Sequence, residues 1–170
     1  MPEIGQRLRA CIAMEEACAR AYDALRGLFA DDPGAAALWS GLAADEREHA
    51  SALTLAKVAE RIGQLPADFV PASFPAIYKA YNMAINLRER ALEPGLGLRE
   101  ALDLCLSLES STAESYFFDV MNRETGSEAV RSIQKIYRKE ISHAEKVARF
   151  MRERGMAPPR SHKGKDRSGA

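Results

Sequence analysis

Two of the three histidines follow a glutamate at a spacing of three residues. The two pairs are Glu46-x-x-His49 and Glu140-x-x-His143. Residues three apart share one face of a helix, and both pairs fall on the apolar stripe of their segments. An ionised carboxylate buried there needs a partner, because burying it alone is prohibitively costly. Carboxylate oxygens and imidazole nitrogens on one buried face therefore predict metal chemistry inside a helical protein.

Two further glutamates interrupt apolar stripes elsewhere in the chain. Each is followed seven residues later by a tyrosine, which is two helical turns, so the glutamate and the tyrosine share a face. The interval from this glutamate to the glutamate of the next Glu-x-x-His pair is 31 residues in both cases. One offset of 94 residues maps Glu15, Tyr22, Glu46 and His49 onto Glu109, Tyr116, Glu140 and His143. The chain therefore contains an internal repeat of a helical hairpin.

The spacing also predicts where the repeated side chains meet. In an antiparallel hairpin, residues equidistant from the turn lie at the same height. The midpoint of Glu15 and His49 is residue 32, and the midpoint of Glu109 and His143 is residue 126, each within an expected turn. Packing the two hairpins together would bring four carboxylates and two imidazoles to one level. Two divalent cations would neutralise the four negative charges, and iron or manganese suits this oxygen and imidazole set, with zinc as an alternative.

The elements that position these residues are all expected to be helices. Apolar residues recur at steps of three and four, and no segment alternates with period two, so we expect no sheet. Asp32 is a suitable N-cap and Pro33 suits a first turn. Three prolines between residues 64 and 75 exclude a regular helix there and predict an ordered crossover. The expected helices cover residues 3–30, 33–62, 77–92, 98–122 and 127–154.

The repeated motifs resemble those of the ferritin-like superfamily and, within it, of the rubrerythrin-like di-iron domain. The resemblance covers residues from about 5 to 153 and depends on Glu-x6-Tyr in two helices and Glu-x-x-His in two others. It implies an all-α fold, a ferritin-like antiparallel four-helix bundle with a long crossover, containing an extra helix, between the second and third bundle helices. We expect residues 1–154 to form this domain and residues 155–170 to form a basic, disordered tail.

The resemblance also implies a role for each repeated residue. Glu46 and Glu140 would be the catalytic carboxylates that bridge two iron ions. Each ion would be completed by one remaining glutamate and one histidine, and a tyrosine would hydrogen-bond the ligating carboxylates. The remaining ligands are Glu15 with His49 and Glu109 with His143, and the tyrosines are Tyr22 and Tyr116.

This sequence departs from the rubrerythrin pattern in two respects. Position 112 is threonine, where rubrerythrins commonly carry a further glutamate. No Cys-x-x-Cys pair of a rubredoxin domain is present. Electrons for the metal pair are therefore expected from a separate donor protein.

Composition limits the remaining functional classes. The 24 basic and 24 acidic residues cancel, which argues against nucleic-acid binding. No stretch is long and apolar enough for a membrane span, so no membrane partner is expected. An odd number of cysteines within apolar helical patterns suits a reducing compartment, and the cytoplasm is the expected location.

The expected function is that of an oxidoreductase that reduces peroxide or dioxygen at a carboxylate-bridged di-iron centre. Ferroxidase activity in an iron-storing assembly is one alternative, and an organic-substrate oxygenase is another. A third is a helical interaction module in which the metals are structural or absent. Association into a homo-oligomer, with a dimer favoured over a closed shell, is expected from four apolar residues that the crossover would expose: Phe69, Val70, Phe74 and Ile77.

Overall fold

The structure is a computed structural model that describes residues 2–66, 69, 72–111, 113, 119–137 and 141–159. The described residues form α-helices and include no β-strand, so the all-α prediction is confirmed. The helices are α1 (Pro2–Leu28), α2 (Pro33–Arg61), α3 (Phe74–Leu92), α4 (Leu98–Glu109), α6 (Glu128–Tyr137) and α7 (His143–Glu153). None of these helices combines the length and the apolar composition that a membrane-spanning helix requires.

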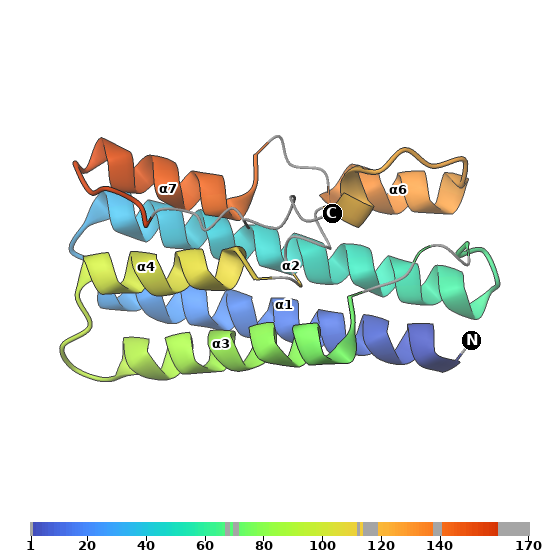
Figure 1. Cartoon of the computed structure of the whole chain (residues 1–170), viewed down its shortest axis with the longest axis horizontal. Helices are drawn as coiled ribbons and strands as arrows, with labels where there is room; N and C mark the ends of the chain where they lie inside the picture. The colour runs from blue at the N-terminus through green and yellow to red at the C-terminus, as the bar shows by residue number, and fades with distance from the viewer. Residues whose placement is uncertain are drawn as a thin grey trace, which may run out of the picture.

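The first two helices form an antiparallel hairpin that runs the length of the molecule (Figure 1). Asp32 is the N-cap of α2, as predicted, and its Oδ1 accepts hydrogen bonds of 3.1 Å from the backbone amides of Gly34 and Ala35. Pro33 occupies the first turn, where the missing N–H costs nothing. Arg154 at the end of α7 binds both carboxylate oxygens of Asp32, at 2.8 and 2.6 Å. The turn is thereby fixed to the last helix.

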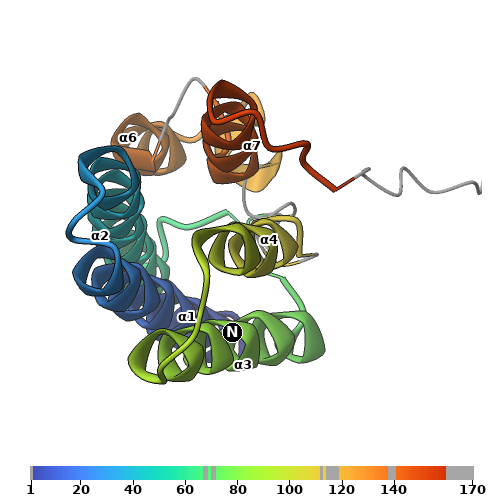
Figure 2. The same cartoon turned by 90° about the vertical axis from the view of Figure 1, so that its left-hand side faces the viewer.

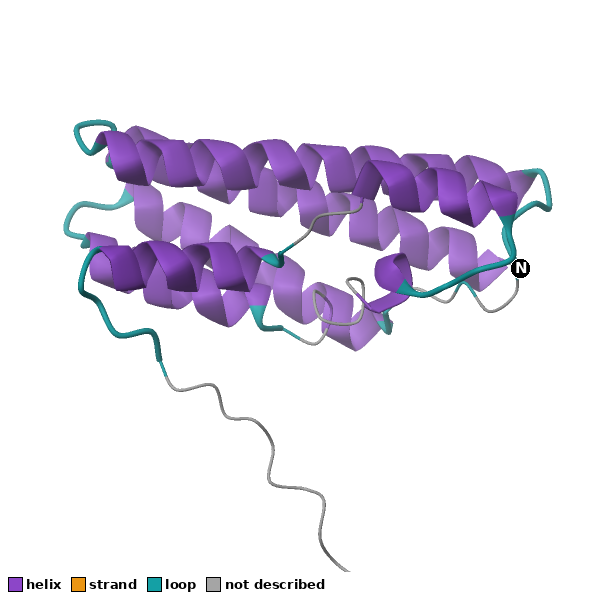
Figure 3. Ribbon diagram, turned by 90° about the horizontal axis from the view of Figure 1, so that it is seen from above, coloured by secondary structure: helices purple, strands orange, loops and turns teal. Residues whose placement is uncertain are grey.

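The remaining helices close around this hairpin, as the end-on view shows (Figure 2). Helix α3 packs on α1 and on α4, while α4 also packs on α7. Both α6 and α7 pack on α2. Figure 1 shows α6 and α7 as separate helices along the same edge of the molecule, and Figure 3 shows from above that helices are the only regular elements among the described residues. The packed helices enclose one core, in which the long α1–α2 pair supplies most of the large side chains.

The segments 98–122 and 127–154 are not continuous helices, contrary to the sequence prediction. Helix α4 ends at Glu109, with Ser110 as its C-cap, instead of continuing to residue 122. The last segment is interrupted before Ser142, which has extended backbone angles and caps α7 by accepting a hydrogen bond from the amide of Glu145. Serine favours such ends because its hydroxyl competes for backbone partners. The interruptions place Glu109 and His143 at helix ends.

The core-facing residues of α6 are Val130, Ile133 and Tyr137, which recur at steps of three and four along one face of the helix. Ile136 lies beside this stripe and is 37% exposed, whereas Tyr137 is 4% exposed.

The crossover does not leave its apolar residues for a second copy of the chain. Phe69 and Ile77 are buried in the protein's own core, and Phe74 is half-buried. Val70 lies outside the described residues. Among the described residues, the exposed cluster on which the oligomer prediction depended is therefore not found, because Phe69 and Ile77 pack in the hydrophobic core.

Candidate metal centre

Five of the six predicted ligands converge at the centre of the helices. Glu15 and Glu46 are 0% exposed, His49 is 3%, His143 is 6% and Glu109 is 7% exposed. They come from α1, α2, α4 and α7, so helices far apart in the sequence contribute to one site. The sixth predicted ligand, Glu140, and the predicted outer tyrosine, Tyr116, lie outside the described residues.

Glu46 lies between the two imidazoles and faces each through a different oxygen. Its Oε2 is 3.1 Å from His49 Nδ1, and its Oε1 is 3.0 Å from His143 Nδ1. One ligand atom from each of these three residues lies within 4.8 Å of the others, which is close enough for all three to hold one cation. Burial alone would raise the pKa of Glu46, but the charges and hydrogen bonds of His143 and His49 outweigh burial and hold that pKa well below its usual value.

Glu15 has the least favourable surroundings of the group. Neither carboxylate oxygen has a hydrogen-bond partner among the described residues, although both are buried. An ion-pair contact joins Oε2 to His49 Nδ1, but it spans 3.8 Å and shares that nitrogen with Glu46. Burial, followed by repulsion from Glu46, raises the pKa of Glu15 to about 8. Without a cation this carboxyl is therefore protonated near neutral pH.

The two histidines are held in the protonated form when no metal is present. Burial disfavours the charged imidazole of His49, but the neighbouring carboxyl groups of Glu15 and Glu46 outweigh burial and raise its pKa to about 9. The pKa of His143 is raised well above its usual value, because attraction to Glu46 and Glu109 exceeds the cost of burial. In the metal-free protein, the two protonated imidazoles thus offset negative charge of the neighbouring carboxylates among the described residues.

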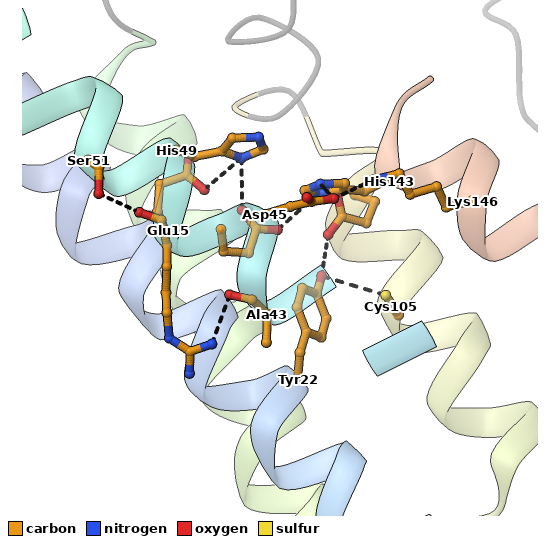
Figure 4. A network of polar contacts seen from close by, with 12 residues as sticks. Glu15, Tyr22, Ala43, Asp45, His49, Ser51, Cys105, His143 and Lys146 are labelled. Atoms are coloured by element: carbon orange, nitrogen blue, oxygen red, sulfur yellow. Dashed lines mark hydrogen bonds and ion pairs between the residues drawn. The ribbon is translucent and has the colours of Figure 1, made fainter. Parts of the chain in front are cut away.

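Glu109, the last residue of α4, is held by a residue of α1. The hydroxyl of Tyr22 on α1 donates a hydrogen bond to Glu109 Oε1, while Oε2 lies 3.3 Å from His143 Nδ1. The resemblance implied that Tyr22 would hydrogen-bond a ligating carboxylate, and its hydroxyl does bond Glu109, one of the predicted ligands. The thiol of Cys105 donates in turn to the Tyr22 hydroxyl at 3.6 Å (Figure 4). Burial raises the pKa values of both Tyr22 and Cys105, so both groups keep their protons.

Asp45 is a functional candidate that the sequence analysis missed. Its Oδ2 lies 3.3 Å from His143 Nε2 and also contacts the ammonium group of Lys146 (Figure 4). His143 Nδ1 faces the carboxylates of Glu46 and Glu109, while Asp45 contacts the other ring nitrogen, Nε2. Histidines that bind metals usually have such a partner, which fixes the ring orientation. The available signal was an acidic residue directly before Glu46 with no assigned role.

Tyr137 is a second residue that the sequence analysis missed. Its ring stacks on His49 with 4.1 Å between centroids, and His49 stacks on His143 with 5.0 Å between centroids. Tyr137 therefore restricts the rotation of the His49 ring. The available signal was its spacing, because Val130, Ile133 and Tyr137 recur at steps of three and four on one buried face of α6.

The described residues fit a resident metal ion of the iron, manganese or zinc class. The donor set contains carboxylates and imidazoles and no thiolate, since Cys105 contacts Tyr22 and not the group of ligands. The unpartnered oxygens of Glu15 are the part of the site that a cation would satisfy. The described ligands account for one cation, and the number of ions depends also on Glu140.

Comparison with known proteins gave no match: no family model, no curated protein and no solved structure is significantly similar to this chain. The functional argument therefore depends on the residues of the site themselves.

Proposed function

We propose that this chain is a rubrerythrin-like member of the ferritin-like superfamily that binds two iron ions and reduces peroxide or dioxygen. The observation that carries the proposal is the buried carboxylate of Glu15, which has no hydrogen-bond partner among the described residues. It lies beside a group of three residues whose geometry suits a cation. A core built only for stability would be expected to satisfy or omit such a carboxylate.

The ligands of the proposed centre are six residues from both hairpins: Glu15, Glu46, His49, Glu109, Glu140 and His143. When bound, an iron pair would supply electrons and a Lewis-acidic surface for a small oxidant. The protein's part is to hold the ligands and exclude water. Glu46 presents one oxygen toward each imidazole, which suits a bridging carboxylate, and burial of the five described ligands keeps bulk water away.

The proposed architecture is a four-helix bundle in which α1, α2, the α4 region and the α6–α7 region are the bundle helices. Helix α3 would be the extra helix of the crossover. Its support is the mutual packing of these elements around the buried carboxylates. Electrons would come from a separate donor protein, and the cytoplasm is the proposed location, in keeping with three free cysteines.

Metal analysis of protein purified without chelator tests the proposal. We expect about two equivalents of iron per chain after aerobic addition of ferrous iron. Glu46→Gln should abolish loading, whereas Glu48→Gln, an exposed neighbour on the same helix, should leave it unchanged. Wild-type protein with less than one equivalent of total transition metal would contradict the proposal. Consumption of peroxide by the reduced, loaded protein would separate peroxide reduction from iron storage, which instead predicts many irons per chain.

The charge balance of the metal-free site favours one alternative, a helical interaction module without metal. Among the described residues, the two protonated histidines lie against the carboxylate of Glu46, and a protonated Glu15 adds no charge. The metal-free chain is therefore expected to fold. Failure to load metal, combined with cooperative unfolding of the same preparation, would favour this alternative.

A further inference from the structure

Two of the three cysteines belong to the same duplication as the candidate ligands. Cys11 lies four residues before Glu15, and Cys105 lies four residues before Glu109, so the 94-residue offset relates them too. Four residues are about one helical turn, which places each thiol on the face of its glutamate. Both cysteines are buried. The third cysteine, Cys18, has no cysteine at the related position of the repeat.

The structure shows what one of the repeated thiols contacts. Cys105 Sγ lies 3.6 Å from the Tyr22 hydroxyl and donates a hydrogen bond to it. A phenol carries a single proton, so a thiol that donates to its oxygen favours the orientation in which the phenol proton points elsewhere. Here that proton is donated to Glu109 Oε1. The thiol, the phenol and the carboxylate thus form one directed chain of hydrogen bonds (Figure 4).

These hydrogen bonds make the two carboxylate oxygens of Glu109 differ in their surroundings. Oε1 is taken by Tyr22, whereas Oε2 lies 3.3 Å from His143 Nδ1 on the side of the candidate ligands. A carboxylate held in this way presents one defined oxygen toward the centre. Hydrogen-bonded neighbours of ligating carboxylates commonly set metal affinity in this manner.

We infer that Cys105 is a positioning residue of the candidate metal centre, which acts through Tyr22 to present Glu109 Oε2 to a cation. Cys11 occupies the corresponding position of the first repeat, and its counterpart tyrosine, Tyr116, lies outside the described residues. The inference rests on the proposed metal function, but the hydrogen bond from the thiol can be tested in the metal-free protein.

The first experiment measures the S–H stretching bands of the reduced, metal-free protein by Raman spectroscopy. The Cys105→Ala variant assigns the band of this thiol by its loss. In Tyr22→Phe the Cys105 band should move to higher frequency, because the phenol oxygen that accepts the hydrogen bond is gone. Tyr81→Phe, on α3, is the matched control and should leave the band in place. An unchanged Cys105 band in Tyr22→Phe would overturn the inference.

The second experiment compares the affinity for ferrous iron of three variants at the same position. Cys105→Ala and Cys105→Val lack a donor and should lose about tenfold in affinity, the low end of the range for outer partners of metal ligands. Cys105→Ser keeps a donor and should retain the wild-type affinity. A thiol that only fills space predicts the reverse order, with Cys105→Val as the best tolerated. Urea unfolding of each variant identifies any loss that follows from reduced stability.

The positioning role of Cys105 and the proposed metal function can be contradicted separately. Wild-type affinity in Cys105→Val, with a wild-type chain that binds iron, overturns the positioning role and leaves the proposed function standing. A wild-type chain that binds no iron overturns both.

Discussion

Glu15 on α1 faces His49 on α2 across the first hairpin, with 3.8 Å between Glu15 Oε2 and His49 Nδ1. Both side chains are buried, and the same imidazole nitrogen lies 3.1 Å from Glu46 Oε2. His49 is therefore shared between two carboxylates and leaves Glu15 incompletely compensated. This shortage of positive charge determines how the site responds to pH and to metal ions.

The metal-free protein should lose stability as the pH rises, and Glu15→Gln should reduce this loss. The pKa of Glu15 is about 8 in the folded protein against 4.5 as its ordinary value, so the folded chain holds a proton between these values that the unfolded chain has released. Stability therefore falls with rising pH through this window, by up to a few kcal/mol. His49, with a folded pKa of about 9 against 6.5, adds a loss in the same direction at higher pH.

Urea unfolding in the presence of a chelator, at about pH 5 and about pH 8, measures this effect. Glu15→Gln should be more stable than wild type at the higher pH and should fail to load metal. Glu16→Gln changes an adjacent exposed residue and should keep the wild-type pH dependence. Equal pH dependence in wild type and Glu15→Gln would contradict the prediction.

Metal binding should release protons and tighten as the pH rises. A cation must displace the protons of Glu15 and His49, whose pKa values of about 8 and about 9 lie above neutrality. The affinity should therefore increase up to about pH 9 and level off above it. Calorimetric titration in two buffers with different ionisation enthalpies counts the protons released. Affinity that is constant between about pH 6 and about pH 8 would be incompatible with this account.

Asp45→Asn should weaken metal binding without unfolding the protein. The aspartate contacts His143 Nε2 at 3.3 Å, and loss of such a partner typically costs 10–100-fold in metal affinity. Competition with a chromophoric chelator measures the change. Asp103→Asn, which alters a carboxylate paired with Arg99 on α4, is the control and should leave the affinity unchanged. Wild-type affinity in Asp45→Asn would show that the contact does not orient the ring.

Asp32→Ala should lower the melting temperature by a few degrees, because it removes both the N-cap of α2 and the pair with Arg154. Asp32→Asn should cost less, since asparagine still caps. Hydrogen bonds from Arg154 and from the Ala35 amide lower the pKa of Asp32 to about 2 against 3.8. The contribution of the charge is therefore complete above about pH 4 and is lost as the pH falls through 2.

Thermal unfolding at neutral pH and near pH 2 measures both effects of Asp32. Asp31→Asn, at the preceding exposed position, is the control. The prediction fails if Asp32→Asn and Asp32→Ala are equally stable at neutral pH and both match wild type.

The sequence predicted the first hairpin almost residue by residue. Helices expected at 3–30 and 33–62 are found at Pro2–Leu28 and Pro33–Arg61, with the expected N-cap. Helical periodicity is a local property, so it also placed Glu15 and His49 on inward faces, and counting from the turn placed them at one height. The second half was predicted less well, because α4 ends at Glu109 and the side chain of Ser142 caps a new helix start, where the periodicity predicted continuous helices.

The sequence by itself determined which described residues of the repeat are buried, because all of them follow the apolar stripes of their segments: Glu15, Tyr22, Glu46, His49, Glu109 and His143. The tertiary structure alone decided the pairs that cross between helices. Tyr22 bonds Glu109 of the other hairpin, Asp45 contacts His143 on α7, and Tyr137 covers His49. Such pairs depend on the rotation of each helix about its axis and on its shift along its neighbour. Those two quantities are set by the packing of the whole core, which no local spacing encodes.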